Sequence, residues 1–351
     1  MLLELPPFEH VNARSVKETT HWLGKYGEKG RVVAGGTDLF GLMKDRVEGP
    51  DFKRPEILIN VKTIPEMKAI AFDDQKGLRI GAAVTLQDLI TSDIIKEKFP
   101  VIGQAARQVG TTQIRTMGTL GGNLCQRPRC VYFRHPHFLC HKRGGNRCYA
   151  LRGEHRYYHS VLKNGKCVMA HPSDMAPVLG ALDGTVIVAS AGGEQEIPLL
   201  ALFQGPNDFL ETILKSYEFI TEIKVPNQKG KTYQSFLKHR IRQSADFALS
   251  SVAAVARVSG GVCEEIRIIL GGVAPLPYRA LMAEDALKGE KLNESLILRA
   301  SEASVEGARP LRMNGYKVEL TKTLVRRALT SIHHQSLGSL QIMQEKQVDI
   351  A

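Results

Sequence analysis

The sequence of 351 residues contains no apolar run that approaches the roughly 20 residues needed by a membrane-spanning helix. Its first seven residues lack both the basic and the apolar segment of a secretory signal. No tandem repeat is visible, and neither a Walker loop nor a G-x-G-x-x-G motif is present. These absences argue against a membrane span and a repeat array, and we expect a protein of the cytoplasm.

The composition is that of a globular protein, with 43% hydrophobic and 24% charged residues. A chain of this length is too long for one ordinary core, so more than one domain is expected. The polar stretch at residues 227–231 interrupts the pattern of buried segments. We therefore expect one domain over residues 1–230, a second over residues 231–333, and a flexible polar tail over residues 334–351.

Acidic residues are nearly absent from residues 125–167, which we call the cysteine segment. It holds five of the six cysteines, namely Cys125, Cys130, Cys140, Cys148 and Cys167. Residues 126–166 contain ten Lys or Arg and one acid, a net charge of +9, against +11 for the whole chain. So polar a segment cannot bury enough apolar surface to order itself, so we expect the cysteines to staple it.

Three kinds of staple are compatible with these thiols. The missing secretory signal weakens the case for disulfides. Zinc sites usually bring cysteines in close pairs, and only the spacing of Cys125 and Cys130 approaches this. An iron–sulfur cluster with four thiolates is negatively charged, and nearby cations would stabilise it. The charge excess is confined to this segment, so we attribute it to local compensation or docking and expect no nucleic acid partner.

Two glycine-rich loops are shaped for close approach by an anion. The first, residues 32–39 (VVAGGTDL), predicts a short strand, a tight turn at Gly35-Gly36 and the start of a helix at Thr37 or Asp38. The second, residues 119–123 (TLGGN), lies in a stretch rich in Gly and Thr, residues 109–124, that we expect to be a loop. Each could be an ordinary turn, but together they favour a ligand with two phosphates.

A further polar side chain follows the cysteine segment. A helix is predicted to start at Pro172 or Ser173, so Asp174 lies at its first turn. Its carboxylate could bind a ribose or ribityl hydroxyl, or it could cap the helix.

Six short motifs occur along the chain in a recognisable order. They are residues 32–39, 119–123, 171–177 (HPSDMAP), 218–226 (EFITEIKVP), 235–240 (SFLKHR) and 271–280 (GGVAPLPYRA). In this order they resemble the FAD-binding medium subunits of the molybdenum hydroxylases, the group of xanthine dehydrogenase and carbon monoxide dehydrogenase. The resemblance implies an α+β fold: a PCMH-type FAD-binding domain of two α/β subdomains, then an antiparallel sheet packed with a helix bundle.

The resemblance also implies which residues hold FAD. The first loop would supply Val32, Val33, Ala34, Gly35, Gly36, Thr37, Asp38 and Leu39, and the second Thr119, Leu120, Gly121, Gly122 and Asn123. Asp174 matches the family's flavin-binding aspartate, and Ile220 and Lys238 match two later flavin contacts; Lys238 could otherwise be a surface lysine. Val109 lies where many members have an aromatic residue near the cofactor, which puts stacking at that position in doubt.

The cysteine segment resembles the insertion in the flavin subunit of 4-hydroxybenzoyl-CoA reductase and in aldehyde oxidoreductase relatives, where it carries a [4Fe–4S] cluster. The resemblance implies four cluster ligands, which are Cys130, Cys140, Cys148 and Cys167. Cys125 would then be a fifth thiol outside the ligand set, and Cys263 a core residue of a strand.

The function implied is that of an oxidoreductase subunit that transfers electrons through FAD and a [4Fe–4S] cluster. Its expected partners are a large molybdenum-cofactor subunit, which acts on the substrate, a small subunit with [2Fe–2S] clusters, and an external electron donor or acceptor. Two alternatives remain at this point: a zinc-stapled nucleic-acid-binding protein, and a family flavoprotein whose insertion is a metal-free docking surface.

Overall fold

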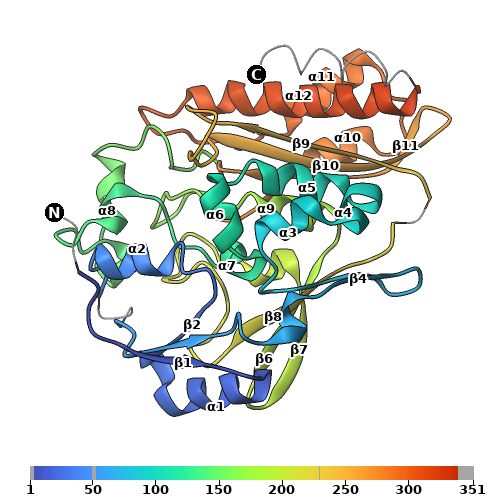
Figure 1. Ribbon diagram of the computed structural model, residues 1–351. Helices are drawn as coiled ribbons and strands as arrows, with labels where there is room; N and C mark the ends of the chain where they lie inside the picture. Colours follow the sequence, from blue (N-terminus) through green and yellow to red (C-terminus); the bar gives the residue numbers. More distant parts are fainter. Residues whose placement is uncertain (1–3, 50–52, 229, 339–351) are drawn as a thin grey trace.

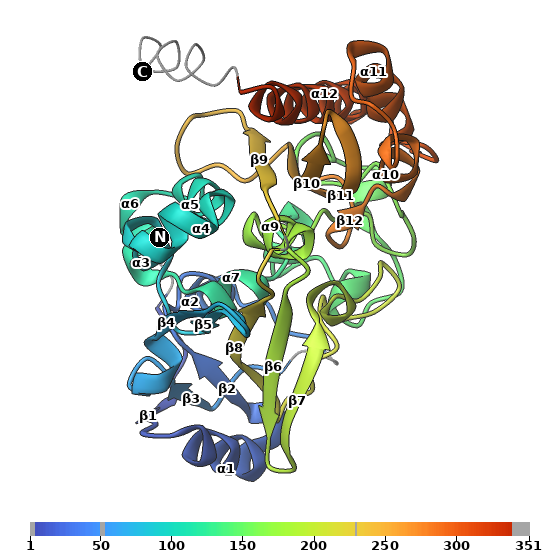
Figure 2. The ribbon, with the colours of Figure 1, turned by 90° about the vertical axis from the view of Figure 1, so that its right-hand side faces the viewer.

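The computed structural model describes residues 4–49, 53–228 and 230–338. Its strands form three sheets, and Figures 1 and 2 show the third sheet and its helices at one end of the molecule and the first two at the other. Helices α3 to α6 and α9 lie between them in both views.

The first sheet is parallel, in the order β1 (Glu9–Asn12), β3 (Ile57–Asn60), β2 (Gly30–Val33). Its central strand is buried at Ile57, Leu58 and Ile59, as a strand with neighbours on both sides should be. Helix α1 (Val16–Tyr26) begins at Ser15, whose hydroxyl accepts a hydrogen bond from the Glu18 N–H at 3.1 Å. The 3₁₀ turn η1 (Gly27–Lys29) leads into β2, and α2 (Leu39–Lys44) follows it.

The second sheet is antiparallel and joins segments far apart in sequence. Its order is β4 (Ile70–Asp73), β5 (Gly77–Gly81), β8 (Phe219–Val225), β6 (Thr185–Ser190), β7 (Gly193–Pro198). The 3₁₀ segments η2 (Pro65–Lys68) and η5 (Leu199–Leu202) flank it. Between β5 and β6 the chain forms α3 (Leu86–Thr91), α4 (Asp93–Lys98), α5 (Pro100–Arg107), α6 (Thr112–Met117), α7 (Leu120–Leu124) and, after the cysteine segment, α9 (Met175–Ala181).

The third sheet is antiparallel, in the order β12 (Tyr278–Arg279), β11 (Val262–Gly271), β10 (Ser250–Ser259), β9 (Thr232–His239). Helices α10 (Leu281–Leu287), α11 (Glu294–Ala303) and α12 (Tyr316–Ser336) complete this part; α12 packs on β9 and β10, and α9 contacts β10 and β11. The α+β fold class predicted from the sequence is confirmed. None of the helices in the described ranges is both long and apolar enough to cross a membrane.

The cysteine segment is ordered by packing against the first glycine loop's helix. It contains only α8 (Val131–Arg134) and the 3₁₀ turns η3 (His141–Arg143) and η4 (Tyr149–Leu151). Cys130, Phe133, Cys140 and Ala150 are buried in a small apolar cluster with Leu42 and Val47, which lie in and just after α2. We expected the cysteines to staple the segment, but part of the apolar core that orders it comes from Leu42 and Val47, outside the segment.

Two expectations need correction. Residues 109–124, expected to be a loop, contain α6 and α7, because Thr111 and Thr119 each accept a backbone N–H and so start a short helix. The flexible tail expected from residue 334 is wrong for residues 334–336, because α12 continues to Ser336. Residues 339–351 lie outside the described residues.

Candidate functional site

A cavity of about 570 Å³ lies between the first two sheets, and both glycine loops line it. We call it the large cavity. Its volume is within the range of cofactor sites. The predicted residues that line it are Val32, Val33, Ala34, Gly35, Gly36, Thr37, Asp38 and Leu39 of the first loop, Thr119, Gly121 and Gly122 of the second, and Ile220 of β8. The structure therefore brings together segments separated by more than 80 residues of sequence.

The two loops touch each other, and glycine makes this possible. A Cβ atom at Gly35 would lie 2.1 Å from the Met117 carbonyl oxygen, just before the second loop. Gly36 has a φ of +67°, which L side chains rarely adopt. Thr119 accepts the Gly122 N–H at 3.3 Å and so fixes the start of α7. A larger residue at Gly35 would separate the loops that form this wall, whereas one at Gly36 would collide with the Phe40 ring.

The other predicted flavin-site residues form a second group outside the cavity wall. Lys238 and Asp174 make an ion pair of 2.6 Å, with side-chain exposures of 1% and 4%. Burial raises the pKa of Asp174, against the opposing effect of Lys238. Lys238 also donates to the Gln108 carbonyl at 3.0 Å, next to Val109.

Asn123 connects this group to the second loop. Its Oδ1 accepts a hydrogen bond from the Ser173 hydroxyl at 2.6 Å, one residue before Asp174. Leu120, in contrast, is fully buried in the main apolar core. Asn123 therefore links the end of the second loop to the start of α9, which Asp174 directly precedes.

Asp38 joins the large cavity to the cysteine segment. Its Oδ1 lies 2.7 Å from the Arg129 guanidinium and 2.6 Å from that of Arg134, and its Oδ2 accepts the Arg127 N–H at 2.8 Å. Burial alone would raise the pKa of Asp38, but these cationic and N–H partners lower it below its usual value. Sequence analysis missed this arrangement, because nothing in the spacing pairs an arginine with a particular carboxylate.

A second connection uses Glu211, which sequence analysis also missed. Its buried carboxylate forms an ion pair with Arg127 and lies 3.3 Å from Lys142 Nζ. The neighbouring residues Leu210 and Thr212 line the large cavity. The cysteine segment therefore neutralises an acid on each of two stretches that form the cavity.

The four predicted cluster cysteines line one small cavity of about 10 Å³, which we call the cysteine cavity. They are Cys130, Cys140, Cys148 and Cys167. Cys125 lines the large cavity instead, and Cys263 is buried in the core of the third sheet, as expected. Within the described ranges, no group of three or more His, Cys, Asp or Glu side chains could hold a metal ion.

Backbone N–H groups point at the four sulfurs. Those of Tyr132 and Phe133 reach Cys130 and those of Lys142 and Arg143 reach Cys140. Those of Ala150, Leu151 and Val168 reach Cys148, and that of Met169 reaches Cys167. Such donors stabilise thiolates. A hydrogen bond from the Cys167 thiol, with these N–H groups, lowers the pKa of Cys148 to about 6, whereas burial raises the pKa of Cys130 to about 12.

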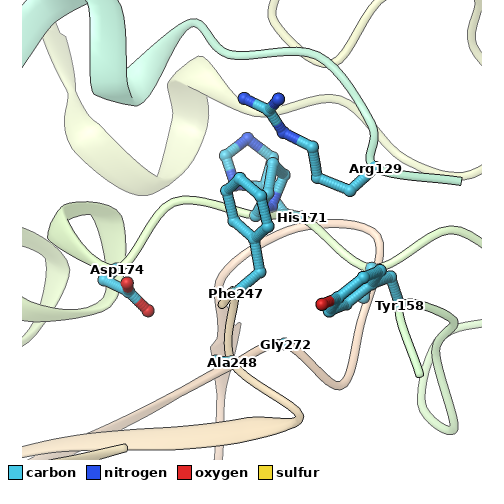
Figure 3. Close-up of a pocket in the computed structure, with 9 residues that line it drawn as sticks. Arg129, Tyr158, His171, Asp174, Phe247, Ala248 and Gly272 are labelled. Atoms are coloured by element: carbon cyan, nitrogen blue, oxygen red, sulfur yellow. The ribbon is translucent and has the colours of Figure 1, made fainter. Parts of the chain in front are cut away.

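A small cavity lies between Asp174 and the cysteine segment (Figure 3). Figure 3 shows Asp174 at one side, Tyr158 at the other, and Arg129 above His171 and Phe247. The Arg129 guanidinium lies 4.4 Å from the centre of the Phe247 ring. His171 Nδ1 accepts the Ser173 N–H at 3.3 Å, while its buried Nε2 has no hydrogen-bond partner among the described residues. This cavity therefore lies between Arg129, which directly precedes Cys130, and Asp174.

Comparison with protein families agrees with this arrangement. Residues 6–228 match the FAD binding domain in molybdopterin dehydrogenase, and residues 235–332 match the CO dehydrogenase flavoprotein C-terminal domain. The chain is thus a flavoprotein with both domains of one class of redox subunit. It belongs to the family of FAD-binding subunits of molybdenum hydroxylase-type dehydrogenases.

The relatives are dehydrogenase and oxidoreductase subunits. The aldehyde oxidoreductase FAD-binding subunit PaoB of Escherichia coli is 33% identical over 310 residues, 87% of this chain and 92% of that one. The glyceraldehyde dehydrogenase medium chain of Sulfolobus acidocaldarius is 29% identical over 332 residues, 93% and 99%. The solved carbon monoxide dehydrogenase of Hydrogenophaga pseudoflava has a TM-score of 0.74 at 26% identity, covering 94% of this chain and 98% of that chain.

The first prediction concerns Asp38. The substitution Asp38→Asn removes the charge that balances Arg129 and Arg134, which are mostly buried. Breaking a buried pair this way should lower the free energy of unfolding by about 3 kcal/mol and the Tm by about 4 °C. Asp93→Asn is the control, because Asp93 is exposed and pairs only with Lys96 on the surface. A thermal melt that shows equal Tm values for both variants would mean that the arginines do not depend on Asp38.

The second prediction concerns pH. Burial, with a contribution from Lys142, lowers the pKa of His171 to about 3. An unfolded histidine has a pKa of about 6.5, so below that pH the unfolded chain binds a proton that the folded chain does not. Stability should therefore fall by about 1.4 kcal/mol per pH unit as the pH drops from about 6.5 towards 3.

The variant His171→Asn tests this pH dependence, because its amide oxygen can still accept the Ser173 N–H. Between pH 7 and pH 5 the variant should lose about 3 °C less Tm than the wild type. The comparison uses the change of Tm with pH and not the Tm itself, since the substitution also alters packing. Parallel curves for the two proteins would show that His171 is not held neutral in the fold.

Proposed function

We propose that the chain is the FAD- and [4Fe–4S]-containing electron-transfer subunit of a molybdenum hydroxylase-type complex. The observation that carries the proposal is the convergence of side chains from distant parts of the sequence on two neighbouring cavities. Two glycine loops face the large cavity, and four cysteines line the cysteine cavity. Asp38 and Glu211 connect the two through ion pairs.

In this proposal the large cavity holds FAD. Its diphosphate would lie against the backbone N–H groups of the first and second glycine loops, where glycine lets the ligand approach closely. The flavin end would extend along Ile220 towards Val109 and the pair of Asp174 and Lys238. The buried Asp174 and Lys238 would orient the ring system, and Lys238 would supply a positive charge beside it.

The same proposal gives the cysteine cavity a [4Fe–4S] cluster held by Cys130, Cys140, Cys148 and Cys167. Each thiolate would bind a different iron, so the sulfurs need not meet the geometry of a single ion. The N–H groups directed at the sulfurs, and Lys142 and Arg143 within the segment, suit a negatively charged group. A zinc-stapled nucleic-acid-binding protein gains no support, because the family matches to FAD-binding proteins cover residues 6–228 and 235–332.

FAD, when bound, supplies the exchange between one-electron and two-electron carriers. The chain's own residues bind and orient the two cofactors and keep water from the sulfurs, since Cys130, Cys140 and Cys167 are buried. The expected partners are a large molybdenum-cofactor subunit, a small subunit with [2Fe–2S] clusters and an external electron donor or acceptor. Relatives named as medium chains or subunits of complexes support this assembly.

The proposal includes the expected domain organisation. Residues 1–230 would form the FAD-binding domain, with residues 125–167 as its cluster-bearing insertion, and residues 231–333 the C-terminal flavoprotein domain. A location in the cytoplasm stays a prediction; the described structure contains six free cysteines, which suits a reducing compartment.

The third prediction tests the position of FAD. Gly122 faces the large cavity, and a side chain there would meet only the Thr119 hydroxyl, at 3.0 Å. Gly122→Asp would place a carboxylate beside the expected diphosphate. Two unit charges about 4 Å apart repel by about 4 kcal/mol near a protein surface, so flavin affinity should fall roughly a hundredfold or more.

The measurement for this third prediction is flavin per chain after gel filtration, together with the circular dichroism spectrum. Gly192→Asp is the matched control, because Gly192 lies in an exposed hairpin turn where a side chain meets only Ser190 Oγ, at 3.6 Å. If Gly122→Asp retains flavin as the wild type does, the second glycine loop does not hold the diphosphate.

The fourth prediction tests the cluster. Anaerobically purified protein should contain about four irons and acid-labile sulfide per chain. Cys140→Ser should abolish iron and cluster absorbance, whereas Cys263→Ser, a cysteine of the third sheet's core, should retain both. A wild type that contains flavin but no iron would agree with the family assignment and would show that the cysteine segment is a docking insertion without a cluster. Zinc without flavin would overturn the whole proposal.

A further inference from the structure

His159 contacts one of the four cysteine sulfurs. Its Nε2 lies 3.3 Å from Cys130 Sγ, and its side chain is almost completely buried. Its Nδ1 has no hydrogen-bond partner among the described residues. One ring nitrogen therefore faces the sulfur, and the other has no hydrogen-bond partner among the described residues.

The surroundings determine which nitrogen carries the proton. Lys317 Nζ lies 2.9 Å from the carbonyl oxygen of His159, so a second positive charge at this buried place would be unfavourable. A neutral imidazole has one N–H. Of the two ring nitrogens, only Nε2 faces an acceptor, the sulfur of Cys130, so the proton belongs on Nε2. The hydrogen bond is then N–H···S, with the ring as donor.

The C-terminal domain holds this ring in place. Lys317, in the first turn of α12, is fully buried and donates to the carbonyls of Tyr157, His159 and Gly272 at 2.9, 2.9 and 2.6 Å. Asn314 adds a hydrogen bond to the His159 carbonyl at 3.4 Å. These hydrogen bonds fix the backbone of residues 157–159. The position of the donor on Cys130 is therefore set by an element that follows the cysteine segment by about 150 residues of sequence.

We infer that His159 is a positioning residue for the redox chemistry of this chain: its N–H···S hydrogen bond to Cys130 raises the reduction potential of the cluster. The inference rests on the proposed function. Reduction adds negative charge to a cluster, and a donor to a ligand sulfur stabilises the more negative state. Cys130, which accepts this bond, directly follows Arg129, whose guanidinium lies 2.7 Å from Asp38 Oδ1.

His155 provides a matched control within the same segment. It is as buried as His159, and its ring stands 6.5 Å away, centre to centre. Its Nδ1 lies 2.7 Å from the Ala150 carbonyl, and its Nε2 accepts the Met313 N–H at 3.1 Å. Both nitrogens are thus used by the backbone, and neither contacts a sulfur. Loss of a buried histidine should have the same effect at both positions. Loss of a hydrogen bond to a cysteine sulfur can occur only at His159.

The experiment is an anaerobic redox titration of the full chain followed by electron paramagnetic resonance. His159→Phe should fill the same space and remove the N–H donor. The equilibrium constant should then shift about tenfold towards the oxidised cluster, which lowers the reduction potential of a one-electron couple by about 59 mV. His159→Gln offers an amide N–H and should recover part of the shift. His155→Phe should titrate at the wild-type potential.

Each result decides the matter. A wild type without iron overturns the proposed function, whatever the variants do. A cluster of equal potential in the wild type and His159→Phe overturns the role of His159 alone, as does an equal shift in His155→Phe. If neither His159 variant retains iron, the wild type grown with ¹⁵N-histidine gives the answer: the reduced cluster should couple to a histidine nitrogen, and absence of that coupling contradicts the inference.

Discussion

The carboxylate of Asp38 connects the large cavity to the cysteine segment through ion pairs. It lies in the first glycine loop, and its charge is balanced by Arg129 and Arg134 and by the N–H of Arg127. Without these partners a buried carboxylate would face the position expected for a diphosphate, and like charges there would repel. The cysteine segment therefore does more than carry cysteines: it makes the first loop compatible with an anionic ligand.

The second connection strengthens the same conclusion. Glu211 is only 2% exposed, and a buried acid is stable only when it is paired. Its partners, Arg127 and Lys142, again belong to the cysteine segment. Much of the basic excess that marks this segment in the sequence is thus used inside the molecule. The exposed remainder, such as Arg147, Arg152 and Lys163, is a smaller surface charge than the sequence indicates.

Local patterns in the sequence predicted the elements well, and distant pairings poorly. Gly35 and Gly36 predicted the turn after β2, because glycine readily adopts a positive φ, as Gly36 does. Residues 119–123 were expected in a loop but form the start of the short helix α7, which Thr119 caps. The α+β fold followed from six ordered motifs. The pairing of Asp38 with Arg129 and Arg134 could not be predicted, because any of the segment's cations could neutralise it. The N–H···S contact of His159 could not be predicted either, because the sequence does not distinguish the five histidines of the segment.

The short run from Cys167 to Asp174 places the two proposed cofactors close together. Seven residues in extended conformation span at most about 25 Å. Along this run the chain is bound on both sides, since Cys167 donates to the Pro206 carbonyl and His171 to that of Ala274. A segment held at both ends by different parts of the fold changes little in length when either end is perturbed. The distance between Asp174 and the cysteine cavity is therefore a property of the whole fold. The small cavity lined by Arg129, His171 and Asp174 lies beside this run.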